Sequence, residues 1–158
     1  MAQTLTIALL VAATAADGIL AGASLDQSIK QLPARQRMGV IAFSVYSRAS
    51  DLGPGIIWYA TLGIGAALLT VAAASAALVM GAAPVHAWPI SIAAVLAVLH
   101  SLTTSRAAPT NFKQRSVPND EVALAAIFNR FERWQTARVV LQTLTFAAAL
   151  WALVTYIS

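Results

Sequence analysis

The chain has 158 residues, of which 59% are apolar and only 10% are charged, and its net charge is +4. Soluble domains carry about 25% charged residues, so this composition is typical of a membrane protein. The length suits one domain over residues 1–158. The absence of cysteine excludes disulfides, thiol catalysis and zinc–thiolate or iron–sulfur sites. No phosphate-binding loop, catalytic-triad spacing or nucleotide fingerprint is present, so hydrolase, kinase, dehydrogenase and nucleic-acid-binding functions have no support.

Four apolar segments are long enough to cross a bilayer. A hydrocarbon core of about 30 Å requires about 20 apolar helical residues. The segments cover residues 4–25, 55–80, 88–104 and 139–157. The first lacks the basic region that precedes a cleavable signal peptide, so we expect it to be a retained span. The sequence therefore predicts an all-α fold, a polytopic membrane four-helix bundle.

All ten Lys and Arg residues lie in two segments between these spans. Four of them fall between Lys30 and Arg48, and six fall between Arg106 and Arg138. Cytoplasmic loops of membrane proteins carry an excess of Lys and Arg. We therefore expect both segments in the cytoplasm and both termini outside, with a bacterial inner membrane as the lipid bilayer that surrounds the chain.

Both basic segments are expected to contain helices. Apolar residues recur at roughly helical spacing over residues 34–50, which predicts an amphipathic helix at the cytoplasmic membrane surface. The second segment is expected to begin as a loop with Pro109 and Pro118, before Asn119 caps a helix. No breaker follows this cap, so the last helix should be on the order of 55 Å long. Its first half is expected to project into the cytoplasm or to bend near Gln135.

Small residues predict close helix packing. Gly18 and Gly22 form a G-x-x-x-G pair in the first span, and Gly63 and Gly65 lie in the second. Such residues let helix backbones approach closely within a bilayer. The pattern fits a tight bundle within one chain, and it equally fits a homo-oligomer that packs through these helix faces.

Two polar residues stand within apolar spans. A carboxylate such as Asp17 costs on the order of 3 kcal/mol in this position and usually faces a cavity or a partner. Asp17 is therefore either a proton-handling or substrate-binding group or one half of a structural pair, with His100 or a polar group of the fourth helix as its candidate partner. His100 suits acid–base chemistry, substrate contact or structural hydrogen bonding. No second ligand stands at metal-binding spacing, so no metal site is predicted.

Arg138 stands at the cytoplasmic entrance of the last span. Arg130 and Trp134 precede it at spacings of four residues, which places the three side chains along one helix face. Arg130 is expected to anchor in lipid headgroups, whereas the polar Gln135 beside Arg138 favours an inward direction for Arg138. Asp51 and Asn111 complete the polar set on this side. The residues expected to form a ligand site in the cytoplasmic half of the bundle are Asp17, His100 and Arg138.

The segment Asn111–Leu150 resembles the anthrone-oxygenase-like family of small four-span membrane proteins. That family typically carries an Asn in a Pro-containing loop, followed by a Trp-x-x-Trp-His-x-x-Arg signature before the fourth span. Asn111, Trp134 and Arg138 match this pattern. Phe131 replaces the first aromatic residue, and Gln135 stands where the family has His.

The resemblance implies an oxygenase that converts an anthrone to an anthraquinone with molecular oxygen and no bound cofactor. Its substrate would be a lipophilic aromatic or quinone-like small molecule. The catalytic residues would be Asp17, His100 and Arg138, and the substrate-binding residues Asn111, Trp134 and Gln135. Gln135 can hydrogen-bond a carbonyl or a phenol, but it cannot take up a proton at neutral pH.

Two other functions are compatible with the same residues. The chain is alternatively a non-enzymatic membrane subunit or small-molecule-binding module that packs as an oligomer, with its polar cluster in a structural role. A third reading is a small transporter, because Asp17 lies within the membrane. Four spans leave little room for a transport path, so this reading requires an oligomer.

Overall fold

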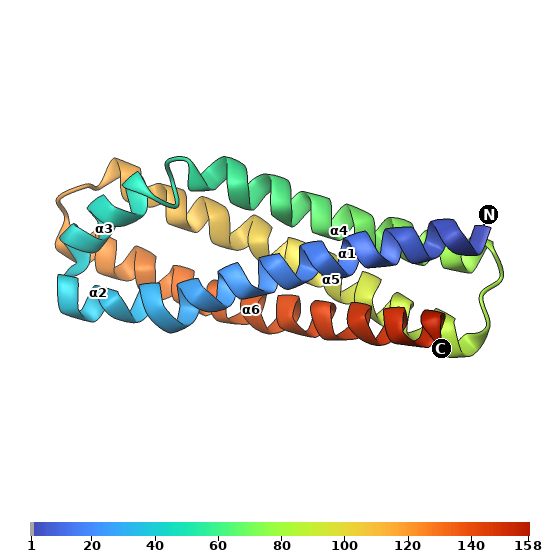
Figure 1. Ribbon diagram of the computed structural model, residues 1–158. Coiled ribbons are helices and arrows are strands. Elements are labelled where there is room, and N and C mark those ends of the chain that lie inside the picture. Colours follow the sequence, from blue (N-terminus) through green and yellow to red (C-terminus); the bar gives the residue numbers. More distant parts are fainter. Residues whose placement is uncertain (1) are drawn as a thin grey trace.

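Four long helices run side by side along one axis (Figure 1). The computed structural model describes residues 2–158, and their side chains from residue 3 onward. The long helices are α1 (Ala2–Asp26), α4 (Gly55–Val79), α5 (Pro84–Phe112) and α6 (Glu121–Ile157). Each is long and apolar enough to span a membrane. This arrangement confirms the predicted all-α four-helix bundle of a multi-pass membrane protein.

The helices form a closed ring of contacts. α1 packs against α4 and α6, and α5 packs against the same two helices. Both termini lie at one end of the bundle, and the two long connections lie at the other (Figure 1). Apolar helices have no hydrophobic drive to associate in lipid, so this ring depends on close packing and on polar contacts between helices.

The first helix continues well past its predicted end. α1 passes through a π-helical segment, η1 (Gln27–Gln31), into α2 (Leu32–Met38). Gly39 then breaks the helix with a φ of 81°, a backbone conformation that L side chains rarely adopt, and α3 (Val40–Ala49) follows. The single amphipathic helix predicted over residues 34–50 is therefore wrong, because the glycine divides it in two.

α3 packs one of its faces onto the end of the bundle. Phe43 is buried there and meets the ring of Phe128 of α6 edge to face, with ring centroids 5.1 Å apart. Ile41 and Val45 remain exposed on α3. An exposed apolar face of this kind suits contact with the headgroup region of a bilayer.

α5 is longer than the predicted span of residues 88–104. It includes Pro109, so the expectation that this proline begins a loop was wrong. Proline removes one helical hydrogen bond and costs about 3 kcal/mol in a helix interior. The following turn is nonetheless held by burial of Thr110 and Asn111 and by a bond from the Thr110 hydroxyl to the carbonyl of Arg106 (2.8 Å). A short 3₁₀ segment, η2 (Lys113–Ser116), follows.

α6 is one uninterrupted helix of 37 residues, as predicted, with a length on the order of 55 Å. Its cap is Asp120, not Asn119, because the Asp120 carboxylate accepts a hydrogen bond from the amide of Ala123 (2.9 Å). The first half of α6 does not project alone. The extended α5, η1 and α3 pack around it and bury Leu124 and Phe128.

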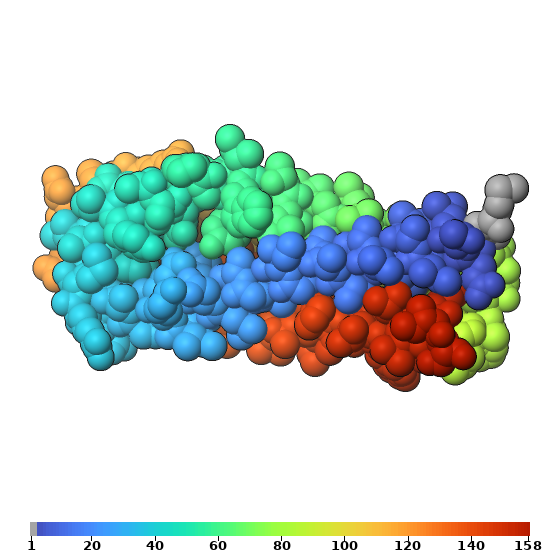
Figure 2. Space-filling model, in the orientation of Figure 1, coloured from blue at the N-terminus to red at the C-terminus, as the bar shows by residue number. Residues whose placement is uncertain are grey.

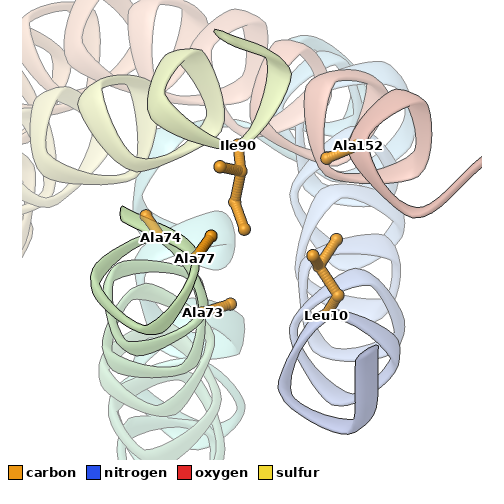
Figure 3. Packing of buried hydrophobic residues seen from close by; sticks show 6 residues of the cluster. All are labelled: Leu10, Ala73, Ala74, Ala77, Ile90 and Ala152. Carbon is orange, nitrogen blue, oxygen red and sulfur yellow. The ribbon is translucent and has the colours of Figure 1, made fainter. Parts of the chain in front are cut away.

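The two ends of the bundle have different cores. At the end with the termini, small residues allow the helices to approach closely (Figure 3). This alanine-rich cluster consists of Leu10, Ala73, Ala74, Ala77, Ile90 and Ala152. At the other end, a cluster rich in aromatic side chains consists of Leu32, Phe43, Ala107, Leu124, Phe128 and Phe131.

The contacts at Gly18 and Gly22 distinguish packing within one chain from packing between chains for the G-x-x-x-G pair. A methyl group on Gly18 would lie 3.0 Å from Cε2 of Phe146, whereas one on Gly22 would meet nothing within 4 Å. Gly18 therefore serves packing within the chain. Gly22, Gly63 and Gly65 have open space beside them.

We expect Gly18→Val to destabilise the bundle by about 1–3 kcal/mol, because the larger side chain must displace the Phe146 ring. Gly22→Val is the matched control in the same helix, and it should change stability far less. Unfolding of the purified protein in detergent, followed by circular dichroism, measures both. Equal destabilisation by the two variants would contradict the packing assignment.

Candidate functional site

A cavity of about 160 Å³ lies between the four long helices, towards the end that carries α2 and α3. A hollow between α1 and the start of α4 is visible on the molecular surface (Figure 2). The apolar lining consists of Leu20, Leu52, Ile56, Ala60, Gly63, Ala108, Phe112 and Phe131. The polar lining consists of Ser24, Gln27, Asp51, Tyr59, Thr104, Asn111, Arg138 and Gln142. A mostly apolar pocket with a few convergent polar groups is typical of a small-molecule site.

Arg138 provides the positive charge of the cavity wall. Its Nη2 donates to Oε1 of Gln27 (3.1 Å), and Nε2 of Gln27 donates to Oδ2 of Asp51 (3.0 Å). The buried Nε of Arg138 has no hydrogen-bond partner among the described residues. The side chain lines the cavity, and its Nε has unused hydrogen-bonding capacity.

Asp51 lies in the turn between α3 and α4 and is half-buried. Burial raises the pKa of this carboxyl above its usual range, although the hydrogen bond from Gln27 and the charge of Arg138 act in the opposite direction. A carboxyl with a raised pKa beside a cationic group is a candidate proton acceptor. Sequence analysis placed Asp51 among the polar residues of this side but gave it no separate role.

Asn111 lines the cavity, but its carbonyl oxygen is already engaged. Oδ1 accepts from Nε2 of Gln114 (2.8 Å), and that nitrogen also donates to Oγ of Ser47 (3.2 Å). Oε1 of the fully buried Gln114 accepts from the hydroxyl of Ser44 (3.0 Å). This network joins the end of α5 and η2 to α3, and it leaves only the amide nitrogen of Asn111 to donate to a ligand.

Asp17 and His100 are buried in the bundle, but neither lines the cavity. Oδ2 of Asp17 accepts a hydrogen bond from the hydroxyl of Thr70 in α4 (2.8 Å). The expected partner of Asp17, His100 or a group of the fourth span, was therefore wrong, because α1 turns this side chain towards α4. Both ring nitrogens of His100 are buried without a hydrogen-bond partner among the described residues.

Trp134 and Gln135 also lie away from the cavity wall. Trp134 packs against the cluster rich in aromatic side chains, and Gln135 is fully buried. Nε2 of Gln135 donates to the backbone carbonyl of Ser24 (3.3 Å). Arg130, the third member of the predicted stripe, is exposed. Direct substrate contact through Trp134 or Gln135 has no support in this geometry.

Five polar residues of the cavity had no role in the sequence analysis: Ser24, Gln27, Tyr59, Thr104 and Gln142. Gln142 was detectable, because it is a polar residue inside the predicted last span, and its Oε1 is buried without a partner among the described residues. The sequence indicates a role for Gln27 less clearly, because this residue follows the first predicted span in a segment whose polar composition is typical of a solvated loop. Its inward position arises in the π-helical segment η1.

The raised pKa of Asp51 predicts a pH dependence of stability. The folded protein holds this proton more tightly than the unfolded chain does, so the stabilising contribution is complete below the ordinary pKa of 3.8. It is lost as the pH rises through the higher folded value. Asp51→Asn keeps an acceptor for Gln27 but cannot ionise, so the free energy of unfolding should fall less with pH in this variant.

Denaturant unfolding in detergent across the acidic range measures this difference. Glu121→Gln removes one exposed carboxylate at the start of α6 and serves as the control for the change in net charge. If the free energy of unfolding fell with pH as steeply in Asp51→Asn as in the wild type, the raised pKa of Asp51 would be contradicted.

No protein-family model matches the chain, and comparisons with the curated proteins and with the solved structures return no match. The likeness of the segment Asn111–Leu150 to the anthrone-oxygenase-like family therefore stays a prediction. What the cavity can do follows from its residues: one guanidinium and one carboxyl among apolar and neutral polar side chains.

Proposed function

We propose that the chain is a membrane protein that binds a lipophilic small molecule through an anionic or enolic oxygen. The observation that carries this proposal is Arg138, whose guanidinium stands in the wall of the cavity with its Nε free of protein partners among the described residues. A guanidinium in an apolar site attracts a negatively charged oxygen strongly, because little water competes for it.

The size of the cavity restricts the ligand. A cavity of about 150 Å³ accommodates benzene, so the observed ≈160 Å³ holds a single ring. A fused three-ring anthrone would have to extend through the hollow between α1 and α4. The geometry therefore favours a quinone-like or phenolic ring whose remaining part, a second ring or an alkyl tail, lies in the bilayer. Such a ligand would enter directly from the membrane.

An oxygenase is the second candidate, favoured by the pairing of Asp51 with Arg138 through Gln27. Asp51 would take a proton from a phenolic or anthrone-type substrate, and Arg138 would stabilise the resulting oxyanion. The carbanion would transfer electrons to molecular oxygen and form a carbon–oxygen bond, and Asp51 would return its proton to the resulting peroxide. Loss of the second hydrogen from the same carbon as a proton, together with cleavage of the oxygen–oxygen bond, would then yield the new carbonyl and water. Asp51 replaces Asp17 and His100 as the proposed base, because those residues do not line the cavity.

We also propose that both termini lie outside a bacterial inner membrane. The support is the position of the basic residues, which all belong to α2, α3, η1, η2 and the adjoining parts of α5 and α6. These elements gather at the end of the bundle opposite the termini (Figure 1). An excess of Lys and Arg marks the cytoplasmic side.

Binding of hydroxynaphthoquinone, an acidic quinone, tests the role of Arg138. Arg138→Gln should weaken binding by about 10-fold or more, because a hydrogen bond to a charged group contributes about 1.5–3 kcal/mol. Arg138→Lys should also weaken it, since an ammonium lacks the planar fork. Arg130→Gln, an exposed position two turns earlier in α6, is the control. Isothermal titration in detergent gives the affinities, and wild-type binding by Arg138→Lys would indicate a headgroup anchor instead.

Oxidation of the anthrone dithranol tests the second candidate. If the protein is an oxygenase, both Arg138→Gln and Asp51→Asn should lower turnover by about 10²-fold, because each removes stabilisation of the transition state. Oxygen consumption and the absorbance of the anthraquinone measure turnover. Binding that responds to Arg138→Gln, without oxygen consumption by the wild type, would favour the binding module over the enzyme.

The natural absence of cysteine makes the orientation simple to test. Asn119→Cys and Ser158→Cys place single thiols at exposed positions at opposite ends of the bundle. A membrane-impermeant maleimide should label residue 158 in intact cells and residue 119 only after lysis. The reverse pattern would overturn the proposed orientation.

A further inference from the structure

Asp17 is a buried carboxylate in the middle of a helix that spans the bundle. Its exposed fraction is 1%, and it stands one helical turn beyond Leu20, which lines the cavity. Oδ2 accepts the hydrogen bond from Thr70, whereas Oδ1 is buried without a partner among the described residues. One half of this carboxylate is therefore unsatisfied.

No basic side chain compensates Asp17. The ion pairs within residues 2–158 involve other carboxylates, those of Asp26 and Glu132. Gly18 faces Phe146 of α6, and Arg138 lies eight residues before Phe146, about 12 Å away along the helix axis. Arg138 is hydrogen-bonded to Gln27 instead.

The other titratable groups of the facing helices do not pair with Asp17 either. In α4 the nearest is Tyr59, eleven residues before Thr70 and therefore about 16 Å away along the helix axis. In α5 it is His100, which makes no hydrogen bond to Asp17. An isolated carboxylate inside a bilayer costs several kcal/mol, so a cation from outside the chain is needed to neutralise it.

The atoms around Asp17 define the chemistry of such a cation. Thr14 lies three residues earlier on the same helix face, and its hydroxyl is buried without a partner among the described residues. The Thr70 hydroxyl lies 2.8 Å from the carboxylate. A set of neutral oxygens with one negative charge suits a monovalent cation, whereas Ca²⁺ takes six to eight oxygen ligands, commonly from several carboxylates.

We propose that Asp17 and Thr14 form an intramembrane site for a monovalent cation, either a proton or Na⁺, that is reached from the cavity. Gln142 lines the cavity and has an unpartnered Oε1, so it offers an intermediate acceptor along the way. The alanine-rich cluster in Figure 3 lies towards the other end of the bundle. The site does not depend on the ligand proposed for the cavity.

Two measurements on the purified full-length protein distinguish the two cations. For Na⁺, the melting temperature of the wild type should be higher in NaCl than in choline chloride of equal ionic strength, and Asp17→Asn should lose this difference. For a proton, the infrared difference between wild type and Asp17→Asn at neutral pH should show the carbonyl band of a protonated carboxylic acid. An ionised Asp17, together with equal melting temperatures in the two salts, would overturn the proposal.

Thr14→Val provides an independent test if Asp17→Asn does not fold. This variant keeps the side-chain volume and removes only the hydroxyl. It should therefore reduce the difference in melting temperature between NaCl and choline chloride several-fold, or shift the infrared carbonyl band of the protonated Asp17. Thr155→Val is the control, because it removes a hydroxyl that bonds the carbonyl of Ala152 near the other end of the bundle (2.8 Å). Equal behaviour of Thr14→Val and wild type in both measurements would also overturn the proposal.

Discussion

Close approach of helices in an apolar solvent is the constraint on which this structure depends. Lipid solvates Leu and Val as well as a protein interior does, so association requires small residues and satisfied polar groups. The alanine-rich cluster meets this requirement at the end with the termini. At the other end, the core consists largely of aromatic side chains, which fill more space than alanine. The cavity lies towards this end of the bundle.

Polar groups at the cavity divide into two kinds. Gln114 bonds its serine partners and Asn111, so this network ties α3 to the end of α5 beside the cavity. Arg138 and Gln142 are only partly engaged, and each retains a buried atom without a protein partner among the described residues. Buried polar groups are nearly always hydrogen-bonded in native proteins, so the second kind marks where a ligand or water belongs.

Much of the fold was predictable from the sequence, because hydropathy and the absence of breakers are local signals. They predicted the four spans and the unbroken α6. The direction in which each residue faces was not predictable in the same way. A helix surrounded by lipid and protein is apolar on all sides, so no amphipathic stripe marks its inner face. Trp134 and Gln135 were therefore assigned to a site that they do not line, while Gln27 was overlooked.

The π-helical segment η1 has an evolutionary consequence. A π-turn contains one residue more than an α-turn, and such segments are frequent at functional sites. Loss of one residue between Gln27 and Gln31 would restore a regular α-helix. Because the wider π-turn absorbs its extra residue, the packing of the helix on either side would change little, whereas the directions of the side chains within the turn would change. Single insertions and deletions in this segment thus offer a route by which related chains diversify their ligands while they preserve the bundle.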